Sequence, residues 1–345
     1  MKNRLITLFK LTIAFGLIFW LIEKGELDFR QLNLLVTIPA IGLFAAFYWL
    51  LGPCILGSIR WRLLLKGAGY SITLYQAFKL QLTGFFFNSA MPGAVGGDLV
   101  KVIYVIRGNP DMGKTPAMMS ILLDRVIGLG GLFSIGMVLA LSAWPTLIAI
   151  NSLKPLLYGL IGLNLGVLIF FIVALYHYRG EDPFQKLFSI KIPGFNILAK
   201  LYDAIRVYRY KRAYFVSCFI ISLIIQGMSL ALFYFIAANV PALNPNLNFS
   251  AIASIFPIGM LTAALPIAPG GLGVGHVAFD RLFEAVGLSG GANIFNIFTL
   301  SQLALNLTGV IAYLSMRKKT GTDLPTEIDS DEAKIYSKPQ RTTID

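Results

Sequence analysis

Four ionisable side chains in apolar parts of the sequence have the types and spacing needed to bind an anion. Asp124 and Arg125 are neighbours inside an apolar run, and Asp98 lies about one helical turn before Lys101. An arginine guanidinium can bind two oxygens of a phosphate at once. The pattern predicts that Arg125 binds a headgroup phosphate, and that Lys101 either assists it or extends to the membrane surface.

The same residues also fit structural roles. An ion pair from Arg125 to Asp98 or to Asp124 would hold helices in register. Asp98 lies near an expected helix start, and the sequence favours a capping role over chemistry there. His276 is either a proton-coupling group or a satisfied structural residue. Five amides either line a polar path or bond helix to helix: Asn88, Asn293, Asn296, Gln302 and Asn306.

Composition places these side chains in a membrane protein. Hydrophobic residues make up 56% of the 345 residues, charged residues make up 13%, and the mean hydropathy is +0.72. Ordinary soluble domains carry about a quarter charged residues. With 2 cysteines and 2 histidines, the chain lacks a disulfide framework and a Cys/His-rich metal centre. We therefore expect no metal, no cofactor and no catalytic residue.

The spans that must position these residues are clear in the sequence, because a helix needs roughly 20 apolar residues to cross a bilayer. Six stretches qualify: Leu5 to Ile22, Leu34 to Ile59, Ala117 to Leu141, Leu156 to Tyr178, Ala213 to Ala238 and Ala292 to Met316. Two further apolar regions, Ile72 to Ile106 and Ala251 to Leu288, are interrupted by Pro and Gly. We expect an all-α polytopic membrane protein of about six transmembrane helices and two re-entrant hairpins.

The two interrupted regions belong to an internal repeat. Pro92 to Val100 aligns with Pro269 to Val277 at an offset of 177 residues, with two Gly, the Pro and the Val identical. The same offset superimposes the flanking spans. Residues 34–141 and 213–316 therefore each contain a span, a broken hairpin and a span, connected through residues 142–212. The charge distribution makes the second copy run in the opposite direction, which is an inverted repeat.

Basic residues set the expected orientation. With the N-terminus in the cytoplasm, nineteen Lys and Arg residues fall in inside segments, Arg60 among them, and four fall outside. We expect the N-terminus, the C-terminus and the basic loop from Arg179 to Arg212 to be cytoplasmic. That loop is either an interfacial helix or a basic connector that only sets orientation. Residues 1–319 form the membrane domain, and residues 320–345 a disordered cytoplasmic tail. The net charge of +12 then reflects topology, so we expect no nucleic-acid partner.

The two breaks predict an anion site. Pro and Gly permit the chain to turn inside the membrane, and the helix that restarts points free N–H groups into the protein. Two such helix ends, entering from opposite faces, would bind an anion. Alternatively, these residues only allow tight packing. Besides Arg125, the predicted site contains Asn88, Pro92, Gly93, Gly96, Gly97, Asp98, Lys101, Asp124, Pro269, Gly270, Gly271, Gly273 and His276.

Three segments occur here in combination. They are Asn-x-x-x-Pro-Gly-x-x-Gly-Gly-Asp-x-x-Lys from Asn88 to Lys101, Leu-Asp-Arg-Val-x-Gly-Leu from Leu123 to Leu129, and Pro-Ile-x-Pro-Gly-Gly-Leu-Gly from Pro266 to Gly273. Together they resemble the flippase-like membrane region of lysylphosphatidylglycerol synthases and its stand-alone relatives, over nearly the whole chain up to Met316. In complete synthases this region is thought to move the modified lipid, while a separate cytosolic domain transfers lysine. Relatives commonly carry Arg-Glu where this chain has Gly275-His276, so no family role is carried over to that position.

Two function classes remain. The favoured one is a translocase for a phospholipid or lipid-linked anionic headgroup in the cytoplasmic (inner) membrane, with its site between the hairpins and no covalent chemistry. The alternative is a membrane-embedded transferase, or its accessory subunit, acting on a phospholipid or polyprenyl phosphate. Lysyl transfer is not expected, because the sequence ends in a short tail. Membrane lipids are the expected partners, with a homo-oligomer or a lipid-modifying enzyme as further candidates.

Overall fold

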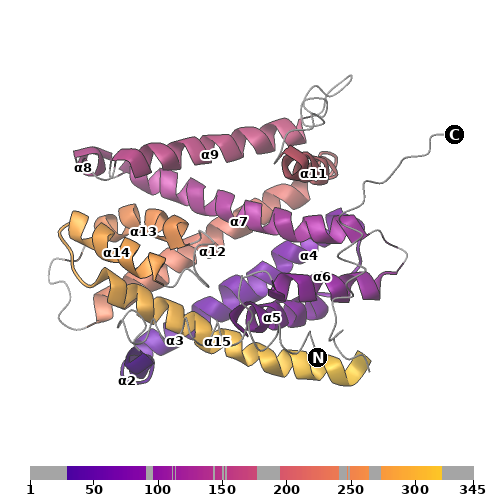
Figure 1. Ribbon diagram of the computed structural model, residues 1–345, viewed down its shortest axis with the longest axis horizontal. Coiled ribbons are helices and arrows are strands. Elements are labelled where there is room, and N and C mark those ends of the chain that lie inside the picture. Colours follow the sequence, from indigo (N-terminus) through magenta and orange to yellow (C-terminus); the bar gives the residue numbers. More distant parts are fainter. Residues whose placement is uncertain are drawn as a thin grey trace, which may run out of the picture.

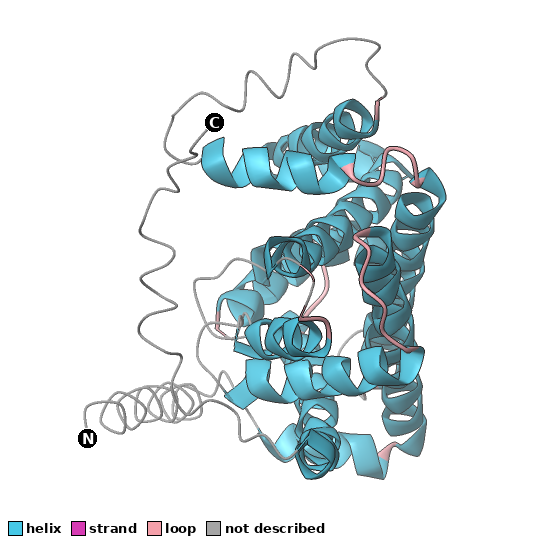
Figure 2. Cartoon of the chain, turned by 90° about the vertical axis from the view of Figure 1, so that its right-hand side faces the viewer, coloured by secondary structure: helices cyan, strands magenta, loops and turns pink. Residues whose placement is uncertain are grey.

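The computed structural model describes residues 29–90, 96–110, 112, 114–142, 144–149, 151, 154–176, 195–240, 247, 249–263 and 273–320. Every regular element within these residues is a helix (Figure 2). The predicted first span, Leu5 to Ile22, and the tail after Thr320 lie outside them. Four described helices are long and apolar enough to cross a membrane: Pro39–Gly67, Lys114–Ser142, Arg212–Asn239 and Gly291–Met316. The all-helical membrane architecture is therefore confirmed.

The first of these spans combines three helical segments, preceded by η1 (Phe29–Asn33) and α2 (Leu34–Thr37). They are α3 (Pro39–Trp49), the π-helical η2 (Leu50–Leu56) and α4 (Gly57–Gly67). Pro53 lies inside η2 and has no N–H to donate, which disturbs the regular helical bonding there. The span continues past its predicted end at Ile59. Arg60 therefore lies inside this helix, one residue after the predicted end of the span.

The first interrupted region forms a pair of helices, α5 (Leu74–Ala90) and α6 (Gly96–Gly108), which pack against each other. Gly97 makes this close approach possible, because a Cβ at this position would lie 1.8 Å from the carbonyl oxygen of Gly84. The long helix α7 (Lys114–Ser142) follows and contacts α6. The described part of the first half thus consists of a long span, two paired shorter helices and a second long span.

In the described part of the connecting region lie α8 (Trp144–Ala149), α9 (Lys154–Leu175) and α11 (Phe195–Arg206). Helix α11 packs on α7 and α9. Tyr202 and Ile205 on α11 are buried in a cluster that includes Leu123, Phe171 and Phe215. Tyr202 and Ile205 of this helix are therefore covered by protein, and its location on the membrane surface stays a prediction.

The second half repeats the order of the first, with α12 (Arg212–Asn239), the packed pair α13 (Phe249–Ala263) and α14 (Val274–Ala285), and α15 (Gly291–Thr320). Its core is rich in aromatic rings, among them Phe233, Phe256 and Phe279. The contacts between the halves are reciprocal, since α5 packs on α15 and α13 packs on α7. Figure 1 shows the two short-helix pairs toward opposite ends of the long axis.

Candidate functional site

A buried ion pair joins the first two long spans. Arg60 on α4 donates from Nε to Oδ1 of Asp124 on α7 at 2.7 Å, and from Nη2 to Oδ2 at 2.9 Å. Its Nη1 also donates to the hydroxyl of Ser222 on α12, at 2.8 Å. Both charged side chains are 12% exposed. This two-point pair links three helices and fixes the guanidinium plane.

A second cluster of charges centres on Asp98 of α6. Arg125 of α7 donates to Oδ2 of Asp98, from Nε at 2.7 Å and from Nη2 at 2.6 Å. The ammonium of Lys101 lies 3.4 Å from Oδ1 of the same carboxylate. Lys101 and Asp98 are buried, whereas the side chain of Arg125 is 45% exposed. Asp98 therefore lies between a buried cation, Lys101, and a half-exposed cation, Arg125, that a ligand can reach.

Polar and aromatic groups hold this second cluster in place. Lys101 donates to Oε1 of Gln81 at 2.9 Å, and its ammonium lies 4.6 Å from the ring centroid of Trp61. At the start of α6, the N–H of Gly97 donates to the side-chain oxygen of Asn88 at 2.9 Å. Asn88 thus satisfies one of the N–H groups that a helix start leaves unbonded. Asp98 lies within the helix and binds cations, so the expected capping role for its side chain was wrong.

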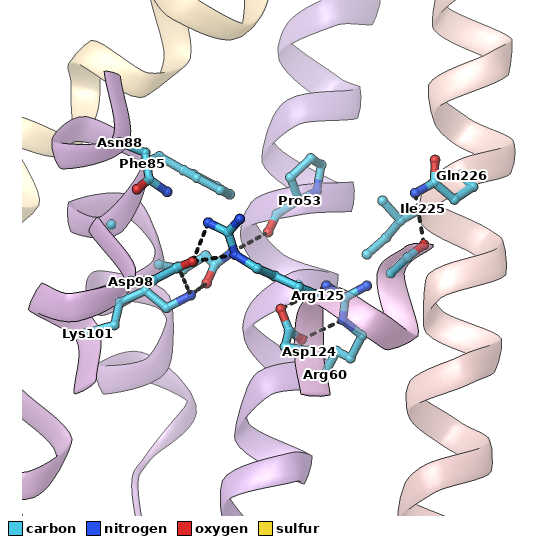
Figure 3. Close-up of a pocket in the computed structure, with 14 residues that line it drawn as sticks. Pro53, Arg60, Phe85, Asn88, Asp98, Lys101, Asp124, Arg125, Ile225 and Gln226 are labelled. Carbon is cyan, nitrogen blue, oxygen red and sulfur yellow. Dashed lines mark hydrogen bonds and ion pairs between the residues drawn. The ribbon is translucent and has the colours of Figure 1, made fainter. Parts of the chain in front are cut away.

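The two clusters line one cavity of about 240 Å³. Its walls come from α5, α6, α7, α12 and the η2–α4 segment, and Figure 3 shows the charged side chains converging from α4, α6 and α7. The lining residues are Pro53, Gly57, Arg60, Gln81, Gly84, Phe85, Asn88, Asp98, Lys101, Asp124, Arg125, Gly128, Ile225 and Gln226. Three of these are cations and two are carboxylates. Both carboxylates are engaged in ion pairs, so the arrangement favours anion binding over general acid–base chemistry.

The described residues predicted from the second break, Gly273 and His276, do not line this cavity. No described residue of α13, α14 or α15 lines it. His276 is buried, receives the N–H of Gly273 on Nδ1 at 3.3 Å, and contacts Oδ1 of Asn296 through Nε2 at 3.4 Å. The contact with Asn296 connects α14 to α15. Gly273 has a φ of 79°, a backbone conformation that glycine adopts readily.

Several predicted site residues remain outside the description. Pro92 and Gly93 fall in residues 91–95, and Pro269, Gly270 and Gly271 fall in residues 264–272. Gly96 and Gly97 are the first two residues of α6, the helix that carries Asp98 and Lys101. The structure therefore brings together Asn88, Gly96, Gly97, Asp98, Lys101, Asp124 and Arg125 around α6 and α7.

Sequence reasoning missed Arg60, Gln81 and Gln226. Arg60 precedes Arg62 and Lys66, so the three together look like the basic end of a span. The signal that identifies Arg60 is its helical spacing from Gly57 and Pro53, which places all three on one face toward the cavity. Gln81 and Gln226 are single amides in apolar helices, and they pair with Lys101 and with the carbonyl oxygen of Gly128 respectively.

Comparisons with known proteins cover most of the chain. A family model described as the lysylphosphatidylglycerol synthase TM region matches residues 7–306, which include every helix that lines the cavity. The UPF0104 membrane protein PH1989 of Pyrococcus horikoshii is 22% identical over 311 residues, which cover 84% of this chain and 88% of that protein. No solved structure matches this chain.

Proposed function

Because this chain belongs to the family of the lysylphosphatidylglycerol synthase transmembrane region, we propose that it translocates a lipid across the cytoplasmic membrane. The family and the apolar helices make it a multi-pass membrane protein. The proposed cargo is a phospholipid or a lipid-linked molecule with an anionic headgroup. The headgroup binds in the cavity between α4, α6 and α7, and its acyl chains remain in the bilayer.

The charge balance of the cavity carries this proposal. Among the described residues, Arg60, Lys101 and Arg125 line it together with two carboxylates, those of Asp98 and Asp124. Unbalanced positive charge among apolar helices is unfavourable, and a bound anion removes the imbalance. Arg125 is the most exposed of the three cations, and its planar guanidinium matches the oxygens of a phosphate.

The proposed topology follows from the distribution of basic residues and from the two pairs of shorter helices. We place the N-terminus, the basic loop and the tail in the cytoplasm because Lys and Arg accumulate in these segments. The α5–α6 and α13–α14 pairs are the re-entrant hairpins of an inverted repeat, entering from opposite faces. Their positions toward opposite ends of the molecule, and the reciprocal packing of α5 on α15 and α13 on α7, support this relation (Figure 1).

Lipid retention by the purified protein tests the proposed cargo. We expect native mass spectrometry to find an anionic phospholipid bound to the wild-type protein. Arg125→Gln should weaken its retention by about tenfold, because a charge-assisted hydrogen bond contributes roughly 1.5–3 kcal/mol. Arg125→Lys should restore part of it, since an ammonium keeps the charge but loses the planar fork.

Arg281→Gln is the matched control for these variants. Arg281 is 78% exposed, pairs with Glu284 and lies outside the cavity. Its loss should leave lipid retention at the wild-type level. If Arg125→Gln retains as much anionic lipid as the wild type does, Arg125 is not a headgroup ligand and the proposed cargo is wrong.

A further inference from the structure

The two arginines of the cavity are bound in different ways. Arg60 meets both carboxylate oxygens of Asp124 and also a serine hydroxyl, and the pair is almost fully buried. Arg125 directs Nε and Nη2 to one oxygen of Asp98, and nearly half of its side chain is exposed. A ligand can therefore approach Arg125 without dismantling the links among α4, α7 and α12.

Asp98 has a second cation that stays in place when Arg125 moves. Its Oδ1 faces the ammonium of Lys101 (Figure 3). The side chain of Lys101 is 6% exposed and is held by Gln81 and by the ring of Trp61. Removing the only partner of a buried carboxylate is strongly unfavourable. Because Lys101 stays paired with Asp98, the carboxylate is not left buried without a cation.

These contacts allow one anion to replace another on Arg125. A phosphate that binds the guanidinium takes the position of the Asp98 carboxylate, and Asp98 remains paired with Lys101. Neither buried charge is left alone at any point of the exchange. When the phosphate departs, Arg125 pairs with the Asp98 carboxylate again.

Resting on the proposed function, we infer that Asp98 is an internal competing anion. It occupies Arg125 when the cavity is empty, weakens headgroup binding by competition, and speeds headgroup release. The ligand it competes with is a phosphate group, carried either by a lipid or by a free phosphate. Lys101 is a positioning residue that holds Asp98 during the exchange. High affinity would trap a lipid in the cavity, so such competition suits a translocase.

The test measures ligand affinity in detergent for three soluble probes: dihexanoyl phosphatidylglycerol, dihexanoyl phosphatidylcholine and inorganic phosphate. We expect Asp98→Asn to bind the phosphatidylglycerol probe at least tenfold more tightly than the wild type, and to move lipid more slowly in liposomes. The affinity for the zwitterionic phosphatidylcholine probe should rise less. If Asp98→Asn raises the affinity for inorganic phosphate alone, Asp98 still competes with phosphate, but the phosphate is not that of a lipid. Unchanged or weaker binding of both anionic probes would overturn the inference.

Asp124→Asn is the matched control, because it makes the same substitution in the pair that we regard as fixed. It should lower thermal stability without tightening the binding of any probe. Equal tightening in the two variants would show a general effect of positive charge and would overturn a special role for Asp98.

Lys101→Gln keeps the inference testable if Asp98→Asn does not fold. Without Lys101, Asp98 depends on Arg125, so the phosphatidylglycerol probe should bind about tenfold more weakly. In the double variant Asp98→Asn/Lys101→Gln, affinity should match that of Asp98→Asn, because no carboxylate remains to be held. If Lys101→Gln binds as the wild type does, or if the double variant loses the tight binding, the role assigned to Lys101 is wrong.

The outcomes also separate the inference from the proposed function. If Asp98→Asn tightens binding while the wild type moves no lipid between leaflets, the competing anion stands and the translocase proposal fails. If the wild type moves lipid and Asp98→Asn leaves affinity unchanged, the translocase proposal stands and the inference fails.

Discussion

At the scale of single residues, the Arg60–Asp124 pair determines how the long helices meet. Its two hydrogen bonds and the bond to Ser222 connect α4, α7 and α12 at a buried point. A pair of this kind adds little net stability when it is intact, but the loss of one partner leaves an uncompensated buried charge. We therefore regard this pair as a fixed part of the cavity lining, whereas Arg125 exchanges its anionic partner.

A double-mutant cycle tests this role. Arg60→Gln should destabilise the protein by about 3–5 kcal/mol, because Asp124 is left charged and buried. Adding Asp124→Asn should recover much of the loss, since no charge then remains. Thermal unfolding in detergent measures both effects, with Arg281→Gln as an exposed control that costs about 1 kcal/mol or less. Additive losses in the double variant would show that the two side chains do not act as a pair.

Residue types were more predictable than residue partners. The sequence identified Asp98, Lys101, Asp124 and Arg125, because charges are rare in apolar helices, and all four line the cavity. It left open whether Arg125 pairs with Asp98 or with Asp124. Consecutive residues of a helix point about 100° apart, so Asp124 faces α4 while Arg125 faces α6. Only the packing of the helices decides such partners.

At the scale of elements, the contact between α5 and α6 sets the position of Asp98. Gly97 and Gly84 bring the two backbones together, and the stem of Lys101 passes directly over Gly84. The side chain of Asn88 on α5 then reaches the first turn of α6. The anion site therefore depends on a pair of glycines as well as on charges.

Adding one methyl group tests that contact. Gly97→Ala should destabilise the protein by about 1–3 kcal/mol and weaken headgroup retention, because the new Cβ would overlap the carbonyl of Gly84. Gly162→Ala is the control, since a Cβ there meets nothing within 4 Å. Gly42 would not serve, because its Cβ would lie 2.2 Å from the carbonyl oxygen of Leu35. Equal stability of the Gly97 and Gly162 variants would show that the close contact between Gly97 and Gly84 does not stabilise the protein.

The long helices and the interruption of both shorter regions could be predicted from hydropathy and from Pro and Gly. The π-helical turn of η2 could not, because Pro53 within an apolar run is equally compatible with a simple kink. The outcome for α11 also depends on packing. Its amphipathic sequence suits a membrane surface as well as a protein surface, and here Tyr202 and Ile205 pack on protein.

At the scale of the whole molecule, the two halves share an element order but differ in charge. The offset of 177 residues carries Asp124 and Arg125 onto Ser301 and Gln302. Ser301 is buried and accepts the indole N–H of Trp49 at 2.8 Å. The second-half positions equivalent to Asp124 and Arg125 therefore carry no charge.

Labelling of introduced cysteines tests the orientation. Cys54 and Cys218 are both buried, so the native background should be low. A membrane-impermeant maleimide should label Lys66→Cys only from the cytoplasmic side and Arg281→Cys only from the outside, since both positions are exposed and we place them at opposite faces. Labelling of both from one side would contradict the proposed topology.

Translocation by the purified protein in liposomes measures the central claim most directly. Fluorescent phosphatidylglycerol in the inner leaflet should become accessible to an external quencher in the presence of the wild-type protein. Arg125→Gln should slow this step by about tenfold or more at equal reconstitution, whereas Arg281→Gln should match the wild type. Exposure no faster than in protein-free liposomes, or an Arg125→Gln rate equal to that of the wild type, would contradict translocation through this cavity.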